Sequence, residues 1–282
     1  MLADLHLHSS VSDGTEPPAQ LVRSVAAAGI DTFALTDHDT TDGWAEAAEA
    51  ARECGLRMIP GIEFSTRTAG ISVHLLGYLP NPAASELAEQ LEAIRTSRRT
   101  RASRIVARIS ADFELSWEDV AAHASDGATI GRPHIADALV ARGHVSSRAQ
   151  AFESILHPRA GYIEPHYAPD TLDAVRILRA AGAVPVLAHP GTRGAGRVIP
   201  RERLLELCEA GLFGLEIDHP ENREDGKVAL RGLAAEFGLA ITGSSDYHGT
   251  GKANRIGQCT TSAEVVDAII AQGTGTRVHD YR

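Results

Sequence analysis

The chain of 282 residues has a formal net charge of −10, with 43% hydrophobic and 23% charged residues, which is ordinary for a globular protein with a sizeable core. The negative excess argues against a broad surface for duplex DNA, because such affinity depends on neutralising phosphates. No apolar stretch could span a bilayer and the first residues lack the basic region of a signal peptide, so we expect a cytoplasmic protein without a membrane partner.

The first predicted element is a strand over 2–8, which contains two histidines at alternate positions. Alternate residues of a strand face the same side, so His6 and His8 project together, and Asp13 follows them in a turn. Adjacent imidazoles at the end of a strand are poor core material, and they are well suited to holding a metal ion.

Short apolar runs then alternate with amphipathic stretches. Strands are predicted over 32–37, 57–64, 71–78, 184–188, 214–217 and 239–243, and helices over 17–28, 42–53, 83–110, 170–181, 201–210, 223–237 and 262–271. This alternation favours an α/β fold with a largely parallel sheet, open or closed into a barrel. The pattern breaks after about residue 110, so we expect a barrel in two parts, 1–110 and 169–282, around a helical insertion over 111–168 that caps the substrate.

Possible metal ligands recur at or near the ends of these predicted strands, where parallel α/β folds collect their chemistry. The candidates are His6, His8, Asp13, His38, Glu63, His74, His189, Asp246 and His248. Any one of them could be an ordinary polar residue, but nine converging on one end would leave buried groups unsatisfied without cations. Nine ligands imply two or three ions. Imidazole and carboxylate without thiolate suit Zn²⁺, Mn²⁺ or Fe, and the three scattered cysteines are expected to be packing residues.

The motifs that carry these residues resemble, in order and spacing, those of the polymerase and histidinol phosphatase (PHP) superfamily as far as about residue 250. They read "DLHLHSSVSDG", "LTDHDT", "GIEFS", "HLLGY", "LAHPG" and "GSSDYHG". The resemblance implies a distorted (β/α)7 barrel with a trinuclear metal centre. It implies one metal on His6, His8, Glu63 and Asp246, a second on Glu63, His74 and His189, and a third on Asp13, His38 and His248. Some relatives have histidine where this chain has Asp13, an exchange that keeps a ligand.

Such a centre would hydrolyse phosphate esters through a metal-activated hydroxide, and the sequence offers no lipase-type elbow or Walker loop for a covalent route. The residues predicted to carry the chemistry are Glu63, Asp246, His189 and His134. The leaving oxygen could be protonated by His38, His189 or His248 where these are not ligands, or by Asp37, Asp39 or His134.

An arginine-rich helix, "EAIRTSRRTRASRIVARI" (92–109), is predicted to contact the substrate. On an ideal helix Arg95, Arg98 and Arg99 lie on the apolar side, whereas Arg101, Arg104 and Arg108 lie opposite and should be solvated. Inward arginines need an anionic partner, which is either a bound phosphate or the glutamates Glu86, Glu89 and Glu92.

The insertion motif "IGRPHIA" (130–136) contains Arg132 and His134, and it resembles that of superfamily members that act on nucleotides and short RNA ends. Those two residues are expected to hold a phosphate, and His157 and Arg159 could line the same cleft. The histidines without motif context, expected to be surface or packing residues, are His123, His144, His166, His219 and His279.

The favoured function is hydrolysis of phosphomonoesters of small nucleotides, such as AMP or a nucleoside 3′,5′-bisphosphate. A 5′-to-3′ exoribonuclease acting on short RNA is the main alternative, but it needs stacking aromatics along a groove, and aromatics are only 5% of the chain. A non-catalytic metal-binding module is the alternative of another class, and the complete ligand set argues against it. Histidinol phosphate is a weaker candidate because the insertion motif points elsewhere.

Overall fold

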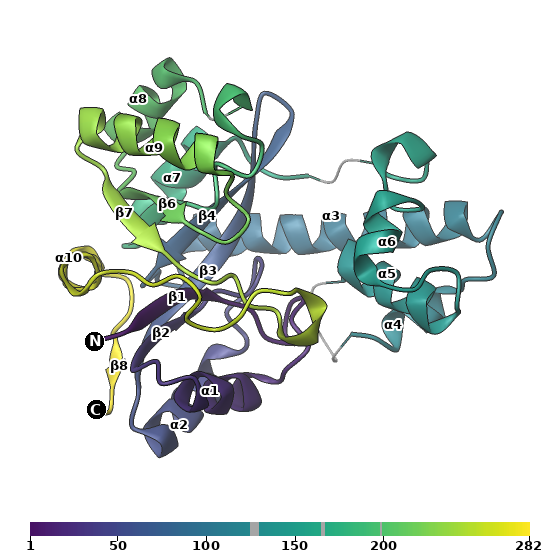
Figure 1. Ribbon diagram of the computed structural model, residues 1–282, viewed down its shortest axis with the longest axis horizontal. Helices are drawn as coiled ribbons and strands as arrows, with labels where there is room; N and C mark the ends of the chain where they lie inside the picture. Colours follow the sequence, from purple (N-terminus) through teal and green to yellow (C-terminus); the bar gives the residue numbers. More distant parts are fainter. Residues whose placement is uncertain (125–129, 165–166, 198) are drawn as a thin grey trace.

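The computed structural model describes residues 1–124, 130–164, 167–197 and 199–282. A body built around a sheet contains both chain termini, and a group of helices lies to one side of it (Figure 1). The long helix α3 (Ser85–Ile109) extends from this body into the helical group.

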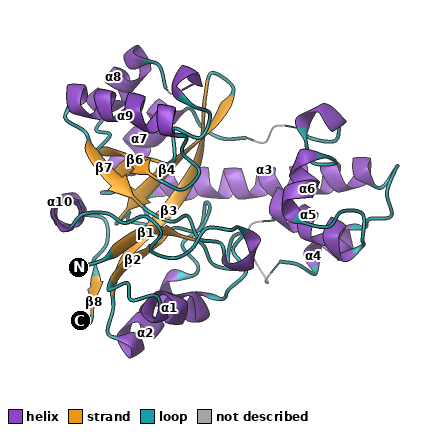
Figure 2. Ribbon diagram, in the orientation of Figure 1, coloured by secondary structure: helices purple, strands orange, loops and turns teal. Residues whose placement is uncertain are grey.

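The sheet follows the order β1-β2-β3-β4-β5-β6-β7, and β8 pairs with β3. The strands are β1 (Ala3–Leu7), β2 (Thr32–Leu35), β3 (Arg57–Thr68), β4 (Ile71–Tyr78), β5 (Val184–Leu187), β6 (Gly214–Asp218), β7 (Ala240–Gly243) and β8 (His279–Asp280). Isolated bridges from Leu7 to Tyr247 and from Ala3 to Thr261 bring the chain beyond β7 back to β1. The sheet therefore curves into a nearly closed barrel (Figure 2), which confirms the predicted fold class.

One strand departs from the predicted parallel arrangement. β4 runs antiparallel to both β3 and β5, whereas β1–β2, β2–β3, β5–β6 and β6–β7 are parallel pairs. β3 and β4 are joined only by Ala69 and Gly70, with φ of 48° and 80°. A connection this short closes a hairpin, since parallel strands require a crossover of a dozen or more residues. The expectation of parallel pairing is therefore wrong at β4.

Helices surround the barrel and also form the group beside it. Those around the barrel are α1 (Pro18–Ala27), α2 (Trp44–Cys54), α7 (Thr171–Ala180), α8 (Arg201–Glu209), α9 (Glu224–Phe237) and α10 (Ala263–Gln272), and those of the group are α4 (Trp117–Ala121), α5 (Arg132–Ala141) and α6 (Arg148–Glu153). No helix in the described ranges has the length and apolar character needed to cross a bilayer.

Helix α3 contributes to two separate hydrophobic clusters. Leu87 and Ile94 in its first half belong to the cluster that lines β3, β4 and α7. Ile105 and Ile109 in its second half belong to a cluster with α4, α5 and α6. The helix is thus the structural connection between barrel and insertion, although the boundaries predicted at 111 and 168 stay a prediction.

Candidate metal centre

The nine candidate ligands converge at one end of the barrel. His6 is in β1, His38 follows β2, His189 follows β5, and Asp246 and His248 follow β7. His74 reaches the same end from the first half of β4, because this strand runs against its neighbours. The β3–β4 hairpin is therefore what brings His74 to the carboxyl ends of the parallel strands.

Glu63, near the middle of the long strand β3, lies at the centre of the group. Its Oε2 is 3.2 Å from His6 Nε2 and 3.1 Å from His8 Nε2, and its Oε1 is 2.7 Å from His74 Nδ1. The imidazoles that approach this carboxylate within 3.2 Å are those of His6, His8, His38, His74 and His189. The two oxygens of this carboxylate therefore offer ligand atoms toward different imidazoles of the cluster.

The other two carboxylates flank Glu63 on the side of β7. Asp246 Oδ1 lies 3.4 Å from His6 Nε2 and 3.2 Å from His8 Nε2. Asp13 Oδ1 lies 3.2 Å from His248 Nε2, and its Oδ2 lies 3.7 Å from His38 Nε2. All nine candidates are thus within one continuous cluster.

Four groups in the cluster place their ligand atoms within 4.8 Å of one another, close enough to share an ion. They are His6, His8, Glu63 and Asp246; His8, Asp13, His38 and His248; His38, Glu63 and His74; and His6, Glu216 and His219. The first group has the same members as one metal site implied by the family resemblance. The individual ligand roles stay predictions.

Several buried imidazole nitrogens in this cluster suit a cation. His6 Nε2, both ring nitrogens of His8, and His219 Nε2 are buried and make no hydrogen bond of good geometry within the described residues, although carboxylate oxygens lie near them. A buried polar atom without a partner is costly, and a divalent cation accepts such lone pairs directly. The residues present therefore fit the metal ions that the donor set predicts.

The carboxyl groups stay ionised despite their burial. Burial alone would raise the pKa of Glu63, but the surrounding imidazoles hold it well below its usual range. Burial opposes ionisation of Asp246 as well, and the Lys252 ammonium together with nearby imidazoles holds the pKa of Asp246 well below the ordinary value. Both side chains are thus anionic and ready to bind cations at neutral pH.

Glu216 of β6 orients two of the candidate ligands. Its carboxylate oxygens lie 3.0 and 3.2 Å from His6 Nδ1, and one of them accepts a hydrogen bond from the His189 backbone N–H at 3.0 Å. A proton held on Nδ1 leaves His6 Nε2 directed at Glu63 and Asp246. The sequence analysis missed Glu216, although an acidic residue inside an apolar strand ("GLEI") was a usable signal.

Lys252 and His219 contact the second oxygen of Asp246, and neither was a predicted site residue. Lys252 Nζ lies 2.5 Å from Asp246 Oδ2 and 3.4 Å from Glu221 Oε1. His219, expected to be a surface or packing residue, is fully buried with Nε2 3.4 Å from the same Asp246 oxygen. "DHPEN" after a strand parallels "AHPG" around His189, which was the available signal for His219.

Two candidate ligands have left-handed backbones. The φ of His189 is 32° and that of Asp246 is 53°, a region that non-glycine residues occupy at a cost of about 1–3 kcal/mol. Buried Asn222 secures the turn at His189, since its Oδ1 accepts from Gly191 N at 2.8 Å and its Nδ2 donates to the Glu216 carbonyl. The fold thus maintains strained geometry where these side chains meet the cluster.

The arginines of α3 are arranged differently from the prediction. Arg98 points inward, 3.0 Å from Asp39 Oδ2, and Arg95 donates to the Asp39 carbonyl while pairing with Glu92. Arg99 is exposed, so its predicted inward orientation is wrong. Arg101, expected in solvent, is buried. Arg104 and Arg108 are about half exposed and pair with Glu164.

The insertion residues differ in how they meet the rest of the site. Arg132, at the start of α5, lies over the Phe152 ring at 5.5 Å. His134 is buried, its Nδ1 accepts from Gly131 N at 3.2 Å, and burial lowers its pKa. His157 Nδ1 accepts from the Arg159 backbone N–H, a local capping contact. His166 lies outside the described residues.

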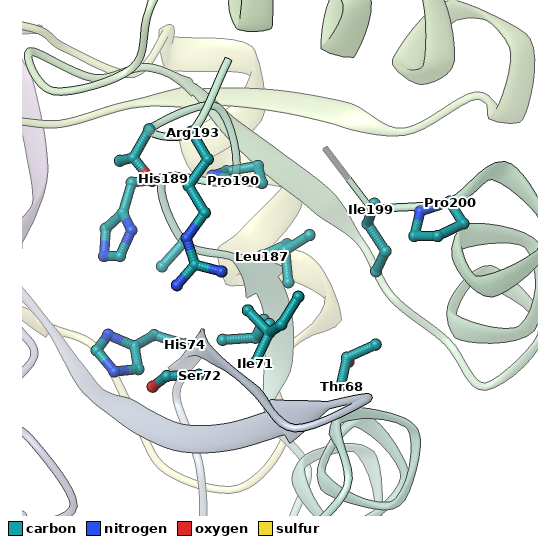
Figure 3. A pocket seen from close by; sticks show the side chains of 13 residues that line it. Thr68, Ile71, Ser72, His74, Leu187, His189, Pro190, Arg193, Ile199 and Pro200 are labelled. Carbon is teal, nitrogen blue, oxygen red and sulfur yellow. The ribbon is translucent and has the colours of Figure 1, made fainter. Parts of the chain in front are cut away.

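Two cavities adjoin the cluster on different sides. One, of about 270 Å³, is lined by His74 and His189 together with apolar side chains (Figure 3). The other, of about 800 Å³, lies between barrel and insertion and is lined by Asp13, His248 and Lys252. A ligand bound at the centre therefore has room on both the hairpin side and the insertion side.

Comparison with known proteins supports the same chemistry. A family model described as the PHP domain matches residues 4–128. A 3′,5′-nucleoside bisphosphate phosphatase of Chromobacterium violaceum is 34% identical over 260 residues, 89% of each chain, and a 5′-3′ exoribonuclease of Haemophilus influenzae is 31% identical over 246 residues, 87% of this chain and 89% of its own. A solved structure assigned as a metal-dependent phosphoesterase of Bifidobacterium adolescentis has a TM-score of 0.93 and 38% identity, covering 96% of each chain.

Proposed function

This chain belongs to the PHP family and is a metal-dependent phosphoesterase, and we propose that it removes phosphate from small nucleotides, nucleoside 3′,5′-bisphosphates foremost. The likeness to a bisphosphate phosphatase over 89% of both chains supports this substrate class. A cytoplasmic location and the absence of duplex DNA or membrane partners stay predictions from composition.

A cluster of three arginines, Arg98, Arg101 and Arg132, supports the choice of a bisphosphate as the substrate. Burial and the neighbouring Arg132 and Arg98 lower the pKa of Arg101 to about 9, so the three guanidinium groups lie near one another. Asp39 pairs with Arg98, whereas Arg132 makes no ion pair within the described ranges. A partly buried guanidinium without an ion pair, as at Arg132, favours a bound anion, and guanidinium groups bind phosphate well. We assign this arginine cluster to the phosphate that is not cleaved.

Glu63, Asp246 and the surrounding histidines would hold two or three ions of Zn²⁺, Mn²⁺ or Fe. Bound there, such cations lower the pKa of a water molecule and neutralise the phosphoryl oxygens in the transition state. The protein's own contribution is a dense set of ionised carboxylates and oriented imidazoles, with Glu216 fixing the tautomer of His6.

We propose that His134 protonates the leaving oxygen. Its Nδ1 accepts a backbone hydrogen bond, so the proton of the neutral ring lies on Nε2, where it can be donated. Asp37 accepts hydrogen bonds from Ser9 and Ser12, and Asp39 accepts from Ser65. Both carboxyl groups are thus engaged with these serines, which leaves His134 ahead of both.

A substrate panel tests the proposal. Phosphate release is measured from adenosine 3′,5′-bisphosphate, AMP and a short 5′-phosphorylated RNA, with bound metals assayed in the same preparation. The highest kcat/KM is expected for the bisphosphate. Stepwise release of nucleotides from the RNA at a higher rate would instead establish an exoribonuclease. Bound metal without cleavage of any of these substrates would support a non-catalytic module.

Metal removal is expected to lower thermal stability as well as activity. An ion present at about 1,000 times its Kd stabilises the folded state by ~4 kcal/mol. For a chain of this size that corresponds to a fall in Tm of roughly 10 °C after chelation. Differential scanning calorimetry before and after dialysis against a chelator measures it. Restoration by Mn²⁺ or Zn²⁺ distinguishes reversible metal loss from damage, and an unchanged Tm would contradict structural burial of the ions.

Lys252→Met is expected to lower kcat/KM roughly 30-fold, as loss of a partner of a metal-binding carboxylate does in other enzymes. The ammonium group holds Asp246 Oδ2 and keeps this carboxyl ionised. The matched control is Lys227→Met at the chain's other lysine, which pairs with Glu224 on α9. Steady-state kinetics and metal content are compared for both. Equal activity of the two variants would contradict this role for Lys252.

A further inference from the structure

An apolar cavity beside the metal centre has no role in the function proposed so far. It lies between the β3–β4 hairpin and the loop that follows β5, and Figure 3 shows the labelled side chains converging from both. Its apolar lining comes from Ile71, Val73, Leu187, Ala188, Pro190, Ile199 and Pro200. Its volume of about 270 Å³ is near the lower end of small-molecule sites, which begin at roughly 300 Å³.

The cavity connects directly to the position where a phosphate would be cleaved. His74 and His189 line it, and both approach the same oxygen of Glu63, at 2.7 and 3.1 Å. A phosphoester held at the centre would therefore extend its organic part past these two imidazoles into the cavity. Asn222 secures the loop on the His189 side, so this wall of the cavity is preformed.

The walls of the cavity combine apolar side chains with the positively charged side chain of Arg193. Arg193 makes no ion pair or hydrogen bond within the part of the chain that the structure describes, and its guanidinium extends into the cavity toward His74 and Ile71 (Figure 3). The polar residues Thr68, Ser72 and Thr192 also border it. A flat aromatic ring suits this combination, because its faces accept aliphatic and guanidinium contacts while its edge accepts hydrogen bonds.

We propose that this cavity binds the nucleobase of the substrate, with Ile71 and Leu187 against one face of the ring and Arg193 against the other. The inference rests on the proposed nucleotide substrate and gives it three separate contacts, at the metal centre, the arginine cluster and the base cavity. A cavity of about 270 Å³ without aromatic lining residues holds one base. Successive stacked bases of an RNA strand would need a longer track of aromatic side chains.

The test compares a nucleotide with its base-less analogue. The variants Arg193→Ala and Ile71→Thr are assayed on adenosine 3′,5′-bisphosphate and on the 1-deoxyribose 3,5-bisphosphate that lacks adenine. Each substitution is expected to lower kcat/KM for the nucleotide roughly fivefold and to leave the base-less analogue unchanged. Threonine keeps a β-branched side chain in β4, and Arg176→Ala, at an exposed position on α7, is the matched control.

Equal losses of kcat/KM on both substrates, or no loss on either, would overturn the assignment of this cavity to the nucleobase. Cleavage of the base-less analogue at the same rate as the nucleotide by the unaltered protein would overturn it too. If the unaltered protein cleaves neither compound, the proposed function fails, and calorimetric titration with adenosine then decides on the cavity. If adenosine binds the unaltered protein and binds more weakly to Arg193→Ala, the base cavity is supported. If adenosine does not bind, the base cavity is rejected.

Discussion

Glu63→Gln is expected to lower kcat/KM for phosphoester hydrolysis about 10³-fold, equivalent to ~4 kcal/mol of transition-state stabilisation. The carboxylate lies within 3.2 Å of ring nitrogens from five histidines, which places it at the centre of the described cluster. Glutamine preserves the shape but removes the negative charge and one acceptor oxygen. The cations would then lose both their bridge and part of their charge balance.

Kinetics and metal content of the same preparations separate the causes of this loss. Glu63→Gln is expected to retain less metal than the unaltered protein, whereas Glu53→Gln, at an exposed position on α2, should match it in both measurements. Circular dichroism and Tm report whether the variant is folded. A folded Glu63→Gln protein with near-normal activity would contradict a bridging role for this carboxylate.

The sequence was sufficient to predict the candidate ligands because their positions follow from strand periodicity and strand ends. The alternation of His6 and His8, and the polar residues after each apolar run, depend only on local structure. The direction of β4 was not predicted, since "TRTAGIS" does not carry the usual Asn-Gly or Asp-Gly hairpin signal. A hairpin and a crossover would run β4 in opposite directions, and His74 would then lie toward opposite ends of the barrel. The direction of this one strand therefore decides whether His74 reaches the site.

Several contacts within the site could not be predicted from the sequence. Glu216 is 210 residues away from His6 in the sequence, and Lys252 reaches Asp246 through the turns that follow β7, so neither contact has the spacing of a regular helix or strand. Helical periodicity placed Arg101 on the outer face of α3, but it could not show that the fold buries this side chain while Arg104 and Arg108 stay about half exposed. Burial of one side chain among several on such a face is a tertiary property, so the environment of Arg101 requires the structure.

Arg132→Leu is expected to lower kcat/KM for adenosine 3′,5′-bisphosphate about 100-fold, because a charge-assisted contact with a phosphate contributes up to ~3 kcal/mol. The effect on AMP should be much smaller, since its single phosphate would occupy the metal centre. Arg132 is partly buried at the first position of α5, contacts the Phe152 ring and has no ion-pair partner in the described ranges. Leucine fills the same space, so a folding defect is not the expected cause of a loss.

The control for this variant lies at the other end of the same helix. Arg142, which follows α5, pairs with Asp119 at 2.8 Å and is exposed, so Arg142→Leu removes an arginine from the insertion without touching the cleft. The ratio of kcat/KM for the bisphosphate to that for AMP is the deciding quantity. A fall of this ratio in Arg132→Leu alone assigns the second phosphate to the arginine cluster. Equal losses on both substrates would mean that Arg132 instead supports the phosphate being cleaved, and the specificity for bisphosphates would then have to come from the cavity beside Lys252 and His248.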